Sequence, residues 1–297
     1  MSENSAISSS SEQRGDPPRP ERTIEVWAGV YDALGALQAE SLRYDALWLS
    51  SLGLSVGRLG LPDSGFLKPE TILAAVSELR QVTKSPLVVD FENGYGLRTV
   101  ELAGLAGLFY EAGADSLCME DSAGEKRNSL WVSPDRQLSD ADDMCERLTT
   151  LVDTAQRHGG SVVARTEALI VGGSVEETVE RVRRYARTGC SAVVVHFRDD
   201  VGQALEVAAH KDEFLGTRLV IIPTKAPSMR FEEFADAGFD VYVAANIALR
   251  AAASAMREEL RSVLTTRNQG DAAERISSLA ELDALVGRDI LVTGVEK

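Results

Sequence analysis

Acidic side chains close two of the short apolar runs in this sequence. Asp90 and Glu92 end the run PLVVDFE, and Glu120 ends the run DSLCMED. Carboxylate oxygens without a cluster of Cys or His favour a hard cation, so three such groups brought together would suit Mg²⁺ or Mn²⁺, held partly through water. The alternative is that Arg165 alone neutralises these carboxylates.

Basic side chains close two further runs. Arg165 and Glu167 end SVVARTE, and His196 ends AVVVHF. Residues i and i+2 of a strand point to the same side, so Arg165 is expected to face the same way as Glu167, and Asp90 the same way as Glu92. Arg and His donate hydrogen bonds to phosphate and carboxylate oxygens. Together with a cation, such a pair predicts a site for a small anion that carries two or three negative charges.

The elements that must position these residues form a regular alternation. Apolar runs span residues 25–30, 46–51, 86–92, 115–121, 161–167, 192–197, 218–224 and 241–246. Between them, apolar residues recur every three or four positions, as expected for helices at 69–83, 97–113 and 174–189. Eight βα units with doubly buried strands predict an α/β fold, a closed (β/α)8 barrel of the TIM type, with an open doubly wound sheet as the alternative. In such a barrel the polar strand ends meet at one mouth.

The two ends of the chain differ from its middle. Residues 1–21 are rich in Ser, Pro and charge, which predicts a disordered tail. Residues 22–297 are expected to form a single barrel domain. After the eighth run, 246–267 reads as a long helix, and a short helix follows around 277–287. We expect these C-terminal helices, about residues 247–297, to pack on a neighbouring subunit.

Composition excludes several classes of function. The formal net charge is −15 and the pI is near 4.7, which argues against nucleic acid as a partner. No stretch reaches the roughly 18 to 20 apolar residues of a membrane span, and the first residues lack the apolar core of a signal peptide. Three scattered cysteines suit a reducing compartment. We therefore expect a cytoplasmic protein that binds a small anion in a locally basic pocket.

Seven segments extend these observations into a resemblance: LWLSSLGLSVGRLGLPDSG, VVDFENGYG, CMEDSAGEKRNSL, VVARTEALI, RRYARTGCSAVVVH, IIPTK and ANIALRAA. With them, from about Val26 to Val286, the chain resembles the phosphoenolpyruvate mutase branch of the isocitrate lyase superfamily. The resemblance implies a barrel that exchanges its eighth helix within a dimer of dimers. It also implies a Mg²⁺-dependent enzyme that interconverts phosphoenolpyruvate and phosphonopyruvate and opens phosphonate biosynthesis, with a phosphonopyruvate decarboxylase to draw off the product.

The resemblance also implies roles for individual residues. Asp90 would lie nearest the metal, with Glu92 and Glu120 as outer ligands linked through water. Lys126 would be the lysine of a gating loop, and Asp63 would lie near the group that is transferred, as covalent nucleophile or as electrostatic guide. Substrate-binding roles fall to Trp48, Ser50, Ser51, Leu52, Asn128, Arg165 and His196.

The stretch EDSAGEKRNS separates the candidate reactions. Carbon–carbon lyases of the superfamily carry a KRCGH-like sequence with a catalytic Cys, where this chain has Lys126-Arg127-Asn128-Ser129. Asn128 favours the mutase over the otherwise similar phosphonopyruvate hydrolase. The chain departs from the mutase pattern EDKxFPKxNS, has Glu92 in place of the usual Asp, and has a bulky Phe91. Open alternatives are the hydrolase, a lyase or decarboxylase for an oxaloacetate-like or malate-like acid or a phosphoenolpyruvate analogue, and a non-catalytic barrel.

Overall fold

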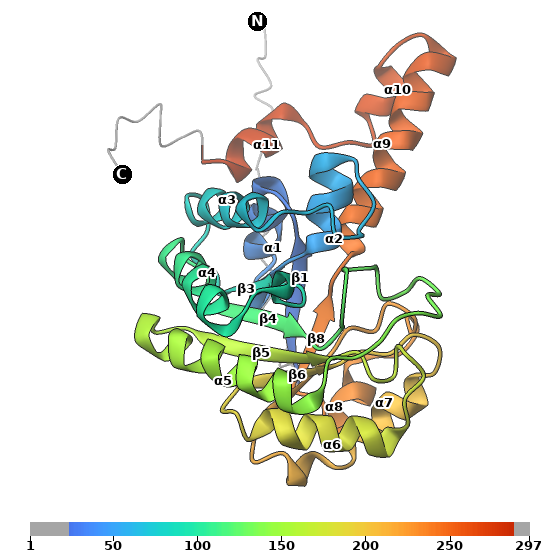
Figure 1. The fold of residues 1–297 in the computed structure, drawn as a ribbon. Helices are drawn as coiled ribbons and strands as arrows, with labels where there is room; N and C mark the ends of the chain where they lie inside the picture. Colours follow the sequence, from blue (N-terminus) through green and yellow to red (C-terminus); the bar gives the residue numbers. More distant parts are fainter. Residues whose placement is uncertain (1–23, 288–297) are drawn as a thin grey trace, which may run out of the picture.

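The structure is a computed structural model that describes residues 24–287, so the predicted tail at 1–21 and the last ten positions lie outside the described residues. Eight parallel strands close into a barrel in chain order (Figure 1). They are β1 (Glu25–Val30), β2 (Ala46–Leu49), β3 (Leu87–Asp90), β4 (Ser116–Glu120), β5 (Ser161–Thr166), β6 (Ala192–Val195), β7 (Arg218–Ile221) and β8 (Val241–Ala244). Pairing of β1 with β8, with Val26 opposite Tyr242, closes the barrel. The prediction of a closed barrel is confirmed, and the open-sheet alternative is wrong.

Helices surround this barrel. The longer ones that alternate with strands are α1 (Ala33–Ser41), α3 (Pro69–Arg80), α4 (Thr99–Glu111), α5 (Ala141–His158), α6 (Val175–Ala186), α7 (Val201–Ala208) and α8 (Phe231–Ala237). Their ends follow the usual capping chemistry, since the Ser174 side chain accepts a hydrogen bond from the amide of Glu177 and α5 ends at Gly159 in the left-handed conformation. The sequence thus predicts the three helices at 69–83, 97–113 and 174–189 to within a few residues.

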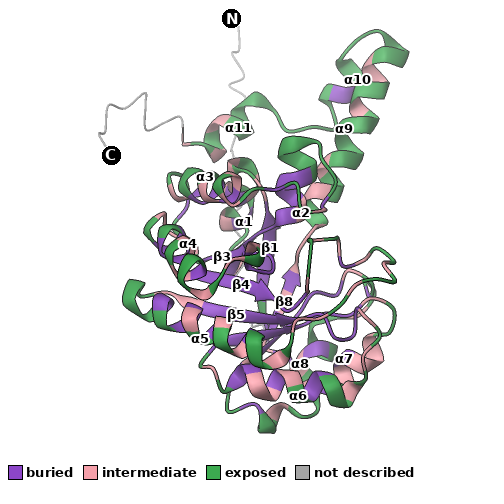
Figure 2. Cartoon of the chain, in the orientation of Figure 1, coloured by how far each residue is buried: buried purple, intermediate pink, exposed green. Residues whose placement is uncertain are grey.

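The strands are buried on both faces. Inside the barrel, side chains from all eight strands pack together, and the rings of Trp27 and Trp48 stack with their centroids 6.4 Å apart. A larger apolar cluster lies between the strands and the helices and includes Phe91 and Phe109 in edge-to-face contact. Figure 2 shows most strand residues buried and much of the outward faces of the helices exposed, although β8 alternates between buried and partly buried residues. The barrel wall is therefore a rigid support for the strand ends.

The glycine-rich stretch after β2 is helical. It forms α2 (Ser51–Gly53) and a π-helical turn (Leu54–Leu59). A Cβ atom at Gly53 would lie 2.7 Å from Cβ of Tyr31, and one at Gly57 would lie 2.8 Å from Cε2 of the same ring. These two glycines therefore allow the helical segment to pack against Tyr31.

The last helices leave the barrel. Helix α9 (Ile247–Thr266) projects away from the strands and carries α10 (Gly270–Ala273), and α11 (Leu279–Leu285) follows (Figure 1). No residue of α9 is buried, and Met256, Leu260 and Leu264 are 58%, 68% and 81% exposed. Packing of this segment on a neighbouring subunit and exchange of a helix stay predictions. Among residues 24–287, no helix combines the length and the apolar character that a membrane crossing requires.

Candidate active site

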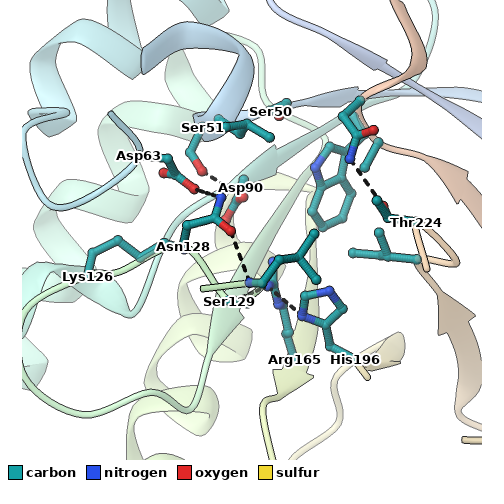
Figure 3. Close-up of a pocket in the computed structure, with 16 residues that line it drawn as sticks. Ser50, Ser51, Asp63, Asp90, Lys126, Asn128, Ser129, Arg165, His196 and Thr224 are labelled. Carbon is teal, nitrogen blue, oxygen red and sulfur yellow. Dashed lines mark hydrogen bonds between the residues drawn. The ribbon is translucent and has the colours of Figure 1, made fainter. Parts of the chain in front are cut away.

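A cavity of about 60 Å³ lies at the mouth formed by the carboxyl ends of the strands (Figure 3). Every residue that the sequence assigned to catalysis or substrate binding lines it, from Trp48 on β2 to His196 after β6. Of the predicted metal ligands, Asp90 lines the cavity, whereas Glu92 and Glu120 do not. The prediction that polar strand ends converge on one mouth is therefore confirmed.

The last residue of β3 faces the cavity. Asp90 is 6% exposed, and its Oδ2 accepts a hydrogen bond of 3.0 Å from the hydroxyl of Ser51. Its Oδ1 lies 3.3 Å from the amide nitrogen of Glu92. Because β3 ends at Asp90 and Glu92 has a φ of 55°, the strand alternation used to pair these two residues does not apply beyond Asp90.

Lys126 lies between the two other predicted metal ligands. Its Nζ donates a hydrogen bond of 3.0 Å to Oε2 of Glu120. Nζ also lies 2.7 Å from Oε2 of Glu92, in an orientation that makes a charge contact without a hydrogen bond. The Lys126 side chain is 9% exposed, so this ammonium group is a buried counter-ion for both carboxylates.

Negative charge exceeds positive charge on this side of the mouth. Burial raises the pKa of Glu92 to about 8, with Asp90, Glu120 and Asp63 adding to the rise and Lys126 opposing it. Among residues 24–287, no three His, Cys, Asp or Glu side chains are placed to hold a metal ion directly. The donor set and the excess charge nevertheless fit a hard cation that reaches Asp90 from the cavity and other carboxylates through water.

Asn128 spans the cavity from the loop between β4 and α5. Its Nδ2 donates a hydrogen bond of 2.9 Å to Oδ2 of Asp63, and its Oδ1 accepts one of 3.0 Å from the amide of Leu130. Burial raises the pKa of Asp63, while Lys126 and the bond from Asn128 lower it. The side-chain amide of Asn128 and the carboxyl group of Asp63 therefore lie side by side at the mouth.

The opposite side of the cavity is basic. Arg165 donates from Nε to Oε1 of Glu167 at 2.7 Å and from Nη2 to Oγ of Ser129 at 3.0 Å. Nδ1 of His196 lies 2.8 Å from both Nη2 of Arg165 and Oε1 of Glu167. Burial and the nearby Arg165 lower the pKa of His196, while Glu167 opposes this shift. Burial opposes ionisation of Glu167, but Arg165 and His196 hold its pKa well below the usual range.

Hydrogen bonds to the carboxylate of Asp121 hold the end of β5. The carboxylate of Asp121 accepts hydrogen bonds from the amide of Glu167 at 2.7 Å, from Oγ1 of Thr166 at 2.9 Å and from the hydroxyl of Tyr185 at 2.7 Å. Arg181 lies 3.3 Å away. The strand end that carries Arg165 and Glu167 is therefore held in one conformation.

Six further residues line the cavity, and the sequence assigned them no role: Ser129, Leu130, Ile222, Thr224, Ala245 and Asn246. Thr224 and Asn246 follow β7 and β8, and the Nδ2 of Asn246 donates to Oγ1 of Thr224 at 3.1 Å. Their position at the ends of the runs 218–224 and 241–246 predicted them at the mouth, although without a role. Ser129 and Leu130 belong to a loop without periodicity, which gives no such signal.

Together the fold and the mouth define a (β/α)8 barrel whose cavity has an acidic side suited to a cation and a basic side suited to an anion. The chain belongs to the phosphoenolpyruvate phosphomutase family, whose family model matches residues 20–264. It is thus an enzyme of the phosphoenolpyruvate mutase/isocitrate lyase superfamily.

Curated relatives carry three different activities. A phosphoenolpyruvate phosphomutase of Streptomyces hygroscopicus is 30% identical over 86% of this chain and 81% of its own length. A 2-methylisocitrate lyase of Shewanella oneidensis is 26% identical over 87% of both chains. A phosphonopyruvate hydrolase of a Variovorax species is 26% identical over 87% of this chain and 88% of its own.

Solved structures share the fold. The phosphoenolpyruvate phosphomutase of Streptomyces platensis subsp. rosaceus superposes with a TM-score of 0.86 at 26% identity, covering 91% of this chain and 93% of the other. A phosphonopyruvate hydrolase in complex with oxalate and Mg²⁺ gives a TM-score of 0.81 at 22% identity, covering 91% and 92%.

Proposed function

We propose that this enzyme interconverts phosphoenolpyruvate and phosphonopyruvate. The observation that carries the proposal is the hydrogen bond of 2.9 Å between Asn128 and Asp63 inside the cavity. In the lyases of the superfamily the corresponding loop carries a catalytic Cys, whereas no Cys is among the described residues that line this cavity. An amide donor beside a carboxyl suits a phosphoryl group in transit better than it suits cleavage of a carbon–carbon bond.

The reaction requires positioning and charge compensation. The bond from phosphorus to the enol oxygen breaks, and a bond from phosphorus to the methylene carbon forms, with no net gain or loss of a proton. Such a transfer passes through a loose state whose charge is spread over the phosphoryl oxygens. Arg165 and Asn128 line the cavity and would donate to those oxygens, with His196 beside Arg165.

The other end of the substrate would lie toward β2 and β3. Ser50, Ser51 and Leu52 line the cavity at the start of α2 and offer hydrogen-bond donors to a carboxylate. A divalent cation at Asp90, supported through water by Glu92 and Glu120, would stabilise the negative charge of the enolate oxygen. We propose Mg²⁺ for this role, because the available donors are oxygens.

Phosphorus NMR on phosphonopyruvate incubated with the enzyme and Mg²⁺ tests the proposal. Phosphoenolpyruvate is the expected product. Pyruvate with free phosphate would instead identify a phosphonopyruvate hydrolase. Release of pyruvate or glyoxylate from oxaloacetate-like or malate-like acids, without turnover of phosphonopyruvate, would identify a lyase.

A further inference from the structure

The loop between β4 and α5, residues 121–140, crosses the mouth and is joined at its base. The amide of Ala123 donates to the carbonyl of Gln137 at 2.9 Å, and the amide of Ser139 donates to the carbonyl of Asp121 at 2.8 Å. Asn93 adds a side-chain bond of 2.9 Å to the carbonyl of Gly124. These bonds fix the start and the end of the loop, but none of them reaches Asn128 in its middle.

Arg136 joins the middle of the loop to the barrel, in addition to the bond of 3.0 Å from Arg165 to the hydroxyl of Ser129. Its Nη2 donates to the carbonyl of Asn128 at 2.7 Å and to the carbonyl of Arg127 at 2.8 Å. Its Nη1 lies 3.3 Å from Oε2 of Glu167. The Arg136 side chain is only 6% exposed although it belongs to a loop. One guanidinium group therefore joins the middle of the loop to the end of β5.

Glu167 links this loop contact to the cavity. Its carboxylate is fully buried, and its other oxygen, Oε1, receives Nε of Arg165 at 2.7 Å. One carboxylate thus contacts a guanidinium group from the loop and one from the cavity. A rigid, planar guanidinium can bind two carbonyl oxygens and a carboxylate together, which a lysine ammonium on a flexible stem does less well.

We propose that Arg136 is a positioning residue that holds the 121–140 loop over the cavity and sets Asn128 against Asp63. The proposal rests on the proposed function, because it assigns the closed loop the task of excluding water while the phosphoryl group migrates. When the loop is loose, water attacks phosphorus in phosphonopyruvate, the carbon–phosphorus bond breaks, and the methylene carbon takes a proton. The products are then pyruvate and phosphate.

Hydrogen exchange tests the positioning role without any substrate. Arg136→Gln is expected to raise the exchange of amides in residues 121–140 by about 10-fold, because the loop then opens without unfolding the barrel. Arg136→Lys should give a smaller rise in exchange. It also provides a second variant for the test if Arg136→Gln does not fold. The matched control is Arg127→Gln, since Arg127 is exposed and its side chain donates to Ser133 within the same loop. Equal exchange in all four proteins would overturn the proposal.

Turnover of phosphonopyruvate tests the consequence. In Arg136→Gln we expect kcat for isomerisation to fall by about 100-fold, as for a misplacement of reacting groups by about 1 Å, with a smaller change in KM. The share of phosphate among the products should rise, whereas Arg127→Gln should match the wild type. Raised loop exchange with unchanged products and kcat would overturn the positioning role. Absence of turnover in the wild type would defeat the proposed function, and the exchange experiment would still decide whether Arg136 holds the loop.

Discussion

The two sides of the barrel mouth balance buried charge in different ways. On the basic side, Glu167 contacts Arg165, Arg136 and His196. On the acidic side, the ammonium group of Lys126 contacts Glu92 and Glu120, and Arg165 reaches Glu120 only at 3.6 Å. The carboxylates around it are Asp63, Asp90, Glu92 and Glu120.

This difference shows which side of the site the protein's own residues organise without a bound ligand. On the basic side, two guanidinium groups share the Glu167 carboxylate and are held by hydrogen bonds, so this side is organised before any ligand arrives and keeps positive charge for an anion. The acidic side keeps negative charge that its own residues do not neutralise, and burial with neighbouring carboxylates raises the pKa of Glu92 to about 8. This excess of negative charge supports the proposal that a cation from solution binds on that side.

Removing the charge of Glu167 should have the largest effect on stability. Glu167→Gln leaves Arg165 and Arg136 facing each other without their common counter-ion in a buried place. Breaking a buried pair in this way costs about 3 to 5 kcal/mol. Urea unfolding measures the change, and a loss below about 1 kcal/mol would contradict the view that the basic side is organised by this carboxylate.

Asn128→Ala separates turnover from stability. Its amide reaches Asp63 on the acidic side, and its carbonyl is held by Arg136 on the basic side. Loss of one such donor lowers kcat by about 100-fold to 1000-fold. Because Asn128 lies in a loop, we expect a stability change within about 0.5 kcal/mol. Losses of turnover and stability of similar size would mark Asn128 as a structural residue.

Added Mg²⁺ should stabilise the protein through the acidic side. At a concentration 100 times the dissociation constant, the gain is about 2.7 kcal/mol. Thermal unfolding with and without Mg²⁺ measures it, and Asp90→Asn is expected to remove it. Equal Mg²⁺ stabilisation of the wild type and of Asp90→Asn would place the cation elsewhere.

The smallest effect is expected for Glu92→Gln, and its sign is opposite to that of Glu167→Gln. Without divalent cations, the neutral amide avoids the cost of burying a carboxylate beside Asp90 and Glu120 but loses the charge contact with Lys126, so the net gain in urea unfolding is less than about 1 kcal/mol. The wild type serves as the reference for both Gln variants. A loss of stability in Glu92→Gln as large as that in Glu167→Gln would contradict this difference between the two sides of the mouth.

The sequence was most informative where it was periodic. Continuous apolar runs predicted all eight strands, and polar residues at the ends of the later runs predicted the mouth, from Ser50 to His196. The same reasoning overextended the third run, since the strand ends at Asp90 and Glu92 adopts a left-handed conformation. Strand alternation holds only while the ladder of backbone hydrogen bonds continues.

Loop contacts could not be predicted in this way. Arg136 and Glu167 are separated by 31 positions, and nothing in SPDRQLSD indicates that its arginine is buried against a strand end. The contact of Lys126 with Glu92 and Glu120 was also missed, because the resemblance assigned those carboxylates to a metal. Both contacts depend on the path of an irregular segment, which local sequence preferences do not determine.

The placement of the three tryptophans has an optical consequence. Trp27 and Trp48 are fixed inside the barrel, whereas Trp131 lies in the 121–140 loop and is 47% exposed. The emission of Trp131 should follow its contact with water when the loop moves, whereas Trp27 and Trp48 are only 5% and 2% exposed. The protein therefore carries a reporter of loop motion, and Trp131→Phe would isolate the signal of the buried pair, of which Trp48 lines the cavity.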